Sequence, residues 1–198
     1  MKPARALLAA GVAVPIIYFT NLIVAEVRTP EIDPWSQLPS DLGVAGLAWA
    51  DVFNAGLVAV GSAAVLGGVG LFLGLRAIGT NGVLSACAGA TMSVAGVVMA
   101  MAGLFPLPDP LHYGFNLLPV GMLTPLLVAA ALGGAKDAGL ERAMIFAGFV
   151  AIVSIALATA SIKDLVTPDN VGLWARGLGL VAFSTVAYAC FSVMRRVK

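Results

Sequence analysis

Long apolar stretches, separated by short polar segments, recur six times along this chain. Crossing the hydrocarbon core of a bilayer takes about twenty helical residues, and an apolar run of that length is typical of a membrane-spanning helix. The pattern predicts an all-α fold, a polytopic transmembrane six-helix bundle that residues 1–198 form as a single domain. The predicted spans cover residues 6–25, 52–75, 84–104, 115–134, 143–162 and 172–194.

Composition favours a membrane protein over a soluble one. Hydrophobic residues make up 60% of the chain, charged residues 11%, and the mean hydropathy is +1.00. These values exceed what a soluble domain of this length needs to fill its core. A net charge of +1 gives no overall field that would attract nucleic acid, so we expect membrane lipids as partners and no nucleic acid.

Basic residues predict the orientation, because Lys and Arg near helix ends resist translocation and stay cytoplasmic. With both termini cytoplasmic, the inner segments hold eight basic residues: Lys2, Arg5, Arg76, Lys136, Arg142, Arg195, Arg196 and Lys198. The outer side holds three, which are Arg28, Lys163 and Arg176. The tryptophans Trp35, Trp49 and Trp174 fall near the outer boundary, where indole rings are common. We therefore expect a multi-pass protein of the plasma (inner) membrane.

A secretory signal peptide is the rival interpretation of residues 1–25, since Lys2 and Arg5 precede an apolar stretch. The apolar run is longer than a signal core, and no small-residue cleavage site follows it. We therefore expect this segment to be the first membrane-spanning helix.

Small residues predict how the spans pack, because helices associate in lipid through close backbone approach. Gly67, Gly70 and Gly74 form one stripe in the second span, and Ser85, Gly89 and Ser93 recur every fourth residue in the third. We expect the two stripes to meet. The faces that carry Gly70 and Gly74 and the Ser85, Gly89 and Ser93 stripe are also where an oligomer could form.

Prolines and cysteines add two expectations. Pro15, Pro119 and Pro125 lie within spans, where each should kink its helix, and the last two make the fourth span the expected wall of an internal cavity. Cys87 and Cys190 both fall near the cytoplasmic side and lack metal-ligand spacing, so we expect two free thiols.

Polar residues gather in the outer half of the predicted bundle. They are Asn21, Asp51, Asn54, Asp109, His112, Asn116 and Arg176. An ionisable group at membrane depth costs about 2.5–3.5 kcal/mol on insertion scales, so such groups usually face a partner, a cavity or water. We expect Arg176 to pair with an outer-side carboxylate such as Asp51 or Asp109, or else to reach the lipid phosphates by snorkelling.

Three prolines between Phe105 and Gly114 end the third span and stiffen a short outer turn. Asp109 can cap the next helix, and His112 follows it by three residues on the same face. Capping explains both residues without chemistry, whereas an acid/base pair acting on a lipid headgroup is the catalytic alternative. One histidine with scattered carboxylates is too few ligands for a metal, so we expect no metal site and no cofactor.

The residues 47–56, LAWADVFNAG, and the later Gly103, Leu104, Phe105 and Pro106 with Asp109 and His112 resemble a known family. It is the six-helix prokaryotic membrane family catalogued as domain of unknown function 998. The resemblance implies a six-helix bundle and no established activity.

The sequence thus predicts a polar pocket open to the outer face that binds a lipid or an amphiphilic small molecule. Arg176 would meet an anionic group, Asp51, Asn54 and Asn116 would contact the ligand, and Asp109 and His112 would orient it. Two alternatives stay open: an enzyme that acts on a lipid headgroup through Asp109 and His112, and a non-catalytic accessory subunit.

Overall fold

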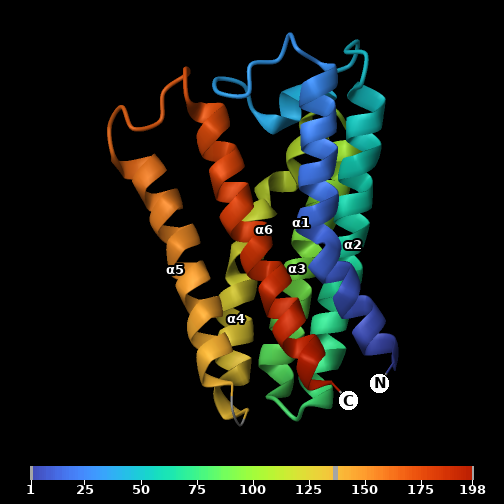
Figure 1. The fold of residues 1–198 in the computed structure, drawn as a ribbon, viewed down its shortest axis with the longest axis vertical. Helices are drawn as coiled ribbons and strands as arrows, with labels where there is room; N and C mark the ends of the chain where they lie inside the picture. Colours follow the sequence, from blue (N-terminus) through green and yellow to red (C-terminus); the bar gives the residue numbers. More distant parts are fainter. Residues whose placement is uncertain (1, 136–137, 198) are drawn as a thin grey trace.

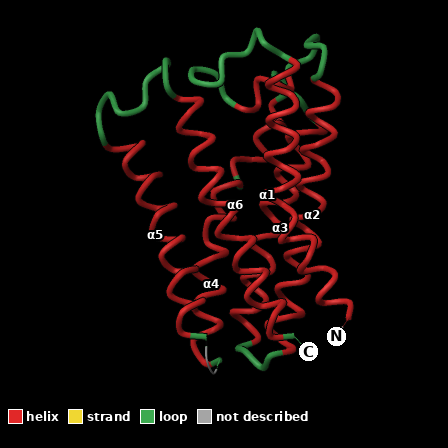
Figure 2. Tube along the Cα trace, in the orientation of Figure 1, coloured by secondary structure: helices red, strands yellow, loops and turns green. Residues whose placement is uncertain are grey.

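The computed structural model describes residues 2–135 and 138–197, and these form an all-helical bundle, as predicted (Figures 1 and 2). Lys136 and Lys198, which entered the charge argument, lie outside the described residues. The α-helices are α1 (Lys2–Arg28), α2 (Ala50–Ala77), α3 (Gly82–Leu104), α4 (Thr124–Ala131), α5 (Gly139–Ser161) and α6 (Val171–Arg196). Four 3₁₀ segments complete the order: η1 (Pro39–Gly43), η2 (Pro110–Asn116), η3 (Leu118–Leu123) and η4 (Leu132–Gly134).

Among the described residues, six helical segments are long and apolar enough to cross a membrane, which confirms the expected number of spans. They run over Pro3–Arg28, Ala50–Ala77, Gly82–Leu104, Pro110–Gly134, Gly139–Ser161 and Val171–Arg196. The two chain ends lie at the same end of the bundle (Figure 1). That arrangement fits six spans, while the cytoplasmic location of the termini stays a prediction. We call the opposite end, with the loop between α1 and α2, the outer end.

The fourth span departs from the expected continuous helix over 115–134. Its first half consists of the 3₁₀ segments η2 and η3, and only Thr124–Ala131 is α-helical. Gly114, Phe115 and Asn116 all have positive φ, which interrupts any right-handed helix there. Pro119 lies at the second position of η3, and Pro125 lies at the second position of α4. The missing amide hydrogen does no harm at these positions, because no intrahelical acceptor is available there. These prolines therefore start helical segments instead of kinking one.

Close backbone contact holds α2 between α1 and α3. A Cβ added to Gly61 would lie 2.4 Å from the Gly96 carbonyl oxygen, and one added to Gly68 would lie 2.6 Å from that of Gly89. Real Cβ atoms do not approach backbone atoms so closely, so these α2 and α3 positions require glycine. The two helices pack tightly, as the small residues indicated.

The prediction that the glycine stripe of α2 meets α3 is wrong. Gly67 and Gly70 face Gly11 and Leu8 of α1, and Gly74 faces Leu8 and Val193 of α6. Glycine stripes lie on more than one face of α2, so spacing alone selected the wrong face for α3. The expected oligomer through the faces of Gly70 and Gly74 and of Ser85, Gly89 and Ser93 stays a prediction. Within a single chain, neighbouring helices already bury Gly70, Gly74, Gly89 and Ser85.

Helix α5 stands at the edge of the bundle, beside α4 and α6 (Figure 1). Its buried residues are Ile145 and Ile152, whereas Leu140, Phe146 and Leu157 are exposed. Since the helix is apolar beyond its first turn, lipid is the solvent that suits this exposed surface. The bundle therefore has a well-packed part, made by α1, α2 and α3, and a looser side made by α4 and α5.

Candidate functional site

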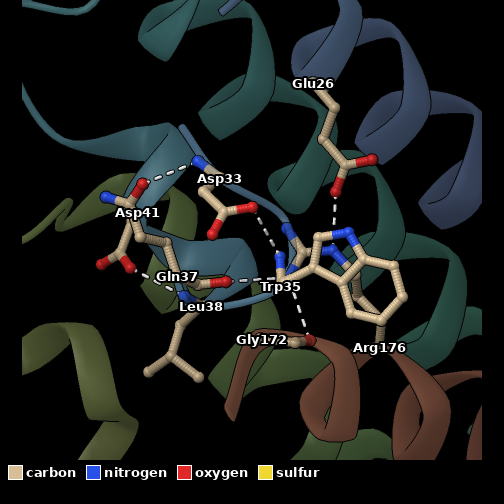
Figure 3. Close-up of polar contacts among 8 residues, drawn as sticks. All are labelled: Glu26, Asp33, Trp35, Gln37, Leu38, Asp41, Gly172 and Arg176. Carbon is tan, nitrogen blue, oxygen red and sulfur yellow. Dashed lines mark hydrogen bonds and ion pairs between the residues drawn. The ribbon is translucent and has the colours of Figure 1, made fainter. Parts of the chain in front are cut away.

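Arg176 fastens the outer ends of three segments together (Figure 3). Its Nε donates to Oε1 of Glu26 on α1 at 2.7 Å, and its Nη1 donates to the carbonyl oxygens of Gln37 and Gly172 at 2.8 and 3.0 Å. The side chains of Arg176 and Glu26 are 13% and 21% exposed, so water screens this ion pair only weakly. The predicted pairing with an outer-side carboxylate is confirmed, but the partner is Glu26 and not Asp51 or Asp109, because α1 and the loop that follows it lie against the start of α6.

The loop between α1 and α2 folds on its own polar side chains (Figure 3). The Asp33 carboxylate accepts hydrogen bonds from the Ser36 hydroxyl at 2.5 Å and from the Trp35 amide at 3.2 Å. These two donors, the hydroxyl first, lower the pKa of Asp33 below its usual value. The Leu173 amide of α6 donates to the Trp35 carbonyl oxygen, which docks the loop on the start of α6. The loop therefore forms a cap over the outer end of the bundle.

Two asparagines join segments at the outer end, Asn54 the loop to α2 and Asn21 α1 to α2. Asn54 is buried, and its Nδ2 donates to the Gly43 carbonyl oxygen at 2.9 Å. Asn21 of α1 donates to the Phe53 carbonyl oxygen at 3.0 Å. Asp51 and Asn116, the other predicted ligand contacts, are both exposed. The structure therefore places Asn54 in a packing role and leaves Asp51 and Asn116 on the surface.

Asp109 and His112 are each engaged with the backbone. Asp109 caps η2 by accepting a hydrogen bond from the Leu111 amide at 2.8 Å. His112 is 5% exposed, and its Nδ1 lies 3.0 Å from the Phe105 carbonyl oxygen. Because a carbonyl only accepts, Nδ1 carries the proton in this hydrogen bond. No hydrogen bond joins the side chains of Asp109 and His112 in the described part of the chain, so the capping interpretation accounts for this turn.

Two cavities lie at the opposite end of the molecule, the end that carries the chain termini (Figure 1). The larger, of about 380 Å³, separates α4 from the first turns of α5. We call it the α4–α5 cavity, and its walls are Leu126, Ala129, Ala130, Gly139, Arg142, Ala143 and Phe146. Six of these seven residues are apolar. Residues of the fourth span line the α4–α5 cavity, but this cavity lies at the opposite end from the polar residues, and the internal cavity expected from kinks at Pro119 and Pro125 stays a prediction.

Arg142 supplies the charge of the α4–α5 cavity. A Cβ added to Gly133 would lie 3.6–3.8 Å from the guanidinium, so the charged group rests beside Gly133, just past the end of α4. Within the described ranges 2–135 and 138–197, the side chain of Arg142 makes no hydrogen bond or ion pair; its backbone amide donates to the Ala138 carbonyl oxygen at 2.9 Å. The cavity therefore presents an apolar interior beside one unneutralised cation. In the sequence, Arg142 served only to predict orientation. The pattern that could have indicated this cavity is the cluster of small residues at 129, 130, 133 and 134, followed by an arginine in the first turn of the next helix.

The second cavity, of about 190 Å³, lies between the α2–α3 turn and the end of the fourth span. We call it the turn cavity, and its walls are Ile78, Gly79, Thr80, Asn81, Leu84, Ala130, Ala131, Gly134 and Ala135. Ala130 lines both cavities. The turn cavity has two uncharged polar side chains in its wall, Thr80 and Asn81, whereas the polar side chain in the wall of the α4–α5 cavity is Arg142.

No group of three or more His, Cys, Asp or Glu side chains that could hold a metal ion occurs among the residues that the structure describes. Cys87 is exposed and Cys190 is buried, and both are free thiols, as expected.

Comparison with known proteins gives one family match. The family model described as "Protein of unknown function (DUF998)" matches residues 12–192. No curated protein and no solved structure matches the chain. Because the match covers most of the chain, extends from within the first span into the sixth and includes the turn with Asp109 and His112, the chain belongs to the DUF998 family, as its resemblance indicated.

Proposed function

We propose that this multi-pass membrane protein binds an anionic amphiphile, with the apolar chain of the ligand in the α4–α5 cavity and its anionic group on Arg142. The observation that carries the proposal is the lining of that cavity, six apolar residues and one arginine without a partner in the described chain. An amphiphile with a negative headgroup has the same division into an apolar and a charged part. The volume of about 380 Å³ falls within the range of small-molecule sites.

Arg142 is the part of the site that provides affinity. Bilayer lipid is as apolar as the cavity wall, so a chain that enters the cavity from the membrane gains little from the hydrophobic effect. A guanidinium can instead donate two parallel hydrogen bonds to a carboxylate or phosphate, and such charge-assisted bonds are about twice as strong as neutral ones. The cavity then selects chain shape, and Arg142 selects negative charge.

This proposal keeps the predicted class of ligand but moves the site away from the outer end. Glu26 and backbone carbonyls already engage Arg176, and Asn54 and Asp109 already hold backbone groups. We infer that these outer residues close the helix ends. The proposal does not involve a reaction.

Equilibrium binding of oleate to the purified protein, with oleyl alcohol as the uncharged comparison, tests the proposal. Arg142→Gln should weaken oleate binding about tenfold, which corresponds to about 1.4 kcal/mol from the lost charge-assisted hydrogen bonds. Ala143→Trp should abolish binding, because an indole would fill the cavity from an exposed wall position. Arg5→Gln is the matched control, since Arg5 is an exposed arginine of α1 at the same end of the bundle.

Oleate affinity that is unchanged in both Arg142→Gln and Ala143→Trp would overturn the proposal. Equal affinity of the wild type for oleate and oleyl alcohol would also overturn it, since the charge would then have no role.

A further inference from the structure

We propose that the turn cavity receives the headgroup of the same ligand, and that the preferred ligand is a glycerophospholipid with a hydroxyl-bearing, amine-free headgroup. This inference rests on the proposed function. It assigns the acyl chain to the α4–α5 cavity, the phosphate to Arg142 and the headgroup to the turn cavity.

The order of the two cavities along the fourth span supports this assignment. Ala130 is a wall of both cavities, and Gly134, one helical turn later, is a wall of the turn cavity. The Arg142 guanidinium rests beside Gly133, between these two positions in the sequence. Along the fourth span the surroundings therefore change from apolar to cationic and then to polar. A glycerophospholipid has the same order of acyl chain, phosphate and headgroup.

The polar atoms of the turn cavity indicate the headgroup chemistry. The Thr80 hydroxyl is engaged by the Leu75 carbonyl oxygen at 2.9 Å and by the Ser85 hydroxyl at 3.0 Å. Asn81 Oδ1 accepts from the Val83 and Leu84 amides at 2.9 and 3.2 Å and so caps α3. The Asn81 Nδ2 group has no hydrogen-bond partner in the part of the chain that the structure describes. Its two N–H groups are available to oxygen atoms of a ligand.

The charges near the turn cavity disfavour an amine headgroup. Arg76 Nη1 lies 3.4 Å from the Thr80 carbonyl oxygen, to which it donates, and Arg142 lies on the other side of the shared wall. Neither Asp nor Glu is among the described residues that line either cavity. An ammonium group would therefore meet two cations and no carboxylate of the described lining residues, whereas a hydroxyl group can accept from Asn81 without a penalty.

Three ligands with matched acyl chains test the headgroup assignment: phosphatidylglycerol, phosphatidic acid and phosphatidylcholine. Phosphatidylglycerol should bind the wild type about fivefold more tightly than phosphatidic acid, which corresponds to about one neutral hydrogen bond. Phosphatidylcholine should bind most weakly. Equal affinity for phosphatidylglycerol and phosphatidic acid, or tighter binding of phosphatidylcholine than of either, would overturn the assignment.

Two variants localise the effect. Asn81→Ser keeps a side-chain oxygen that can cap α3 but removes the amide donors, so it should erase the preference for phosphatidylglycerol and leave phosphatidic acid binding unchanged. Gly134→Leu should do the same by filling the turn cavity, since a Cβ at Gly134 meets no atom within 4 Å. Retention of the full preference in both variants would overturn the assignment.

Failure of this inference is distinguishable from failure of the proposed function. If the headgroup lies elsewhere, Arg142→Gln still weakens oleate and phosphatidic acid binding while Asn81→Ser has no effect on phosphatidylglycerol binding. If the α4–α5 cavity binds no amphiphile, Arg142→Gln leaves the affinity for oleate and for both anionic lipids unchanged.

Discussion

Loss of the Arg176 guanidinium should destabilise the outer end of the bundle. Arg176→Gln removes an ion pair to Glu26 and two hydrogen bonds to the Gln37 and Gly172 carbonyl oxygens. Breaking a fully buried pair costs about 3–5 kcal/mol, and an exposed pair contributes about 0–1 kcal/mol. With side chains 13% and 21% exposed, the pair lies nearer the buried limit, and we expect a loss of about 2–3 kcal/mol.

The measurement is thermal unfolding of wild type and variants in one detergent, followed by tryptophan fluorescence. For a chain of about this length, 1 kcal/mol shifts the Tm by about 2–4 °C, so Arg176→Gln should lower the Tm by about 4–12 °C. Glu31→Gln is the control, because Glu31 is an exposed carboxylate of the same outer loop. It should change the free energy of unfolding by less than about 0.5 kcal/mol.

A double-mutant cycle separates the ion pair from the other contacts of Arg176. Glu26→Gln and Arg176→Gln should show a coupling energy of at least about 1 kcal/mol, because the two side chains are in direct contact. A Tm of Arg176→Gln within 1 °C of the wild type, by the scale of about 2–4 °C per kcal/mol, or a coupling energy near zero would refute the reasoning.

Other predictions concern packing, thiol access and pH. Gly61→Ala should cost about 1–3 kcal/mol of unfolding free energy because its Cβ would clash with α3, whereas Gly177→Ala, in open space on α6, should stabilise by about 1 kcal/mol; similar effects would contradict the packing account. A membrane-permeant maleimide should label the exposed Cys87 in the folded protein and the buried Cys190 only after denaturation; equal labelling before denaturation would be inconsistent with the fold. Because the pKa of Asp33 is lowered on folding, its contribution to loop stability is present above about pH 4 and is lost as the pH falls through the lowered pKa. Pepsin should therefore cut the outer loop faster in Asp33→Asn than in wild type at pH 4 but not at pH 2, and equal rates at pH 4 would argue against the Asp33 turn.

The six spans could be predicted because a bilayer constrains length and apolarity directly. An apolar run of about twenty residues has few structures other than a spanning helix. The fourth span was the exception, since its composition is as apolar as the others while Gly114, Phe115 and Asn116 adopt positive φ. Hydropathy carries no information on backbone conformation, so it could not reveal the 3₁₀ half of this span.

Side-chain partners were less accessible to sequence reasoning. The partner of Arg176 is Glu26, 150 residues earlier, and the pairing depends on how α1 and its loop lie against α6. The glycine stripes showed that α2 packs closely but not which helix meets which face, because glycines line more than one face. The α4–α5 cavity depends on the edge position of α5, which no local pattern encodes. The polar residues at the outer end therefore predicted a pocket there and not beside Arg142.

Photolabelling with a diazirine-bearing fatty acid, followed by mass spectrometry of the labelled peptides, tests the central claim most directly. The account predicts that label concentrates in the segments 126–130 and 139–146, which contain all the wall residues of the α4–α5 cavity. It also predicts that Ala143→Trp prevents this labelling. Label spread evenly over the lipid-exposed faces of all six spans, or concentrated at the outer end beside Arg176, would contradict it.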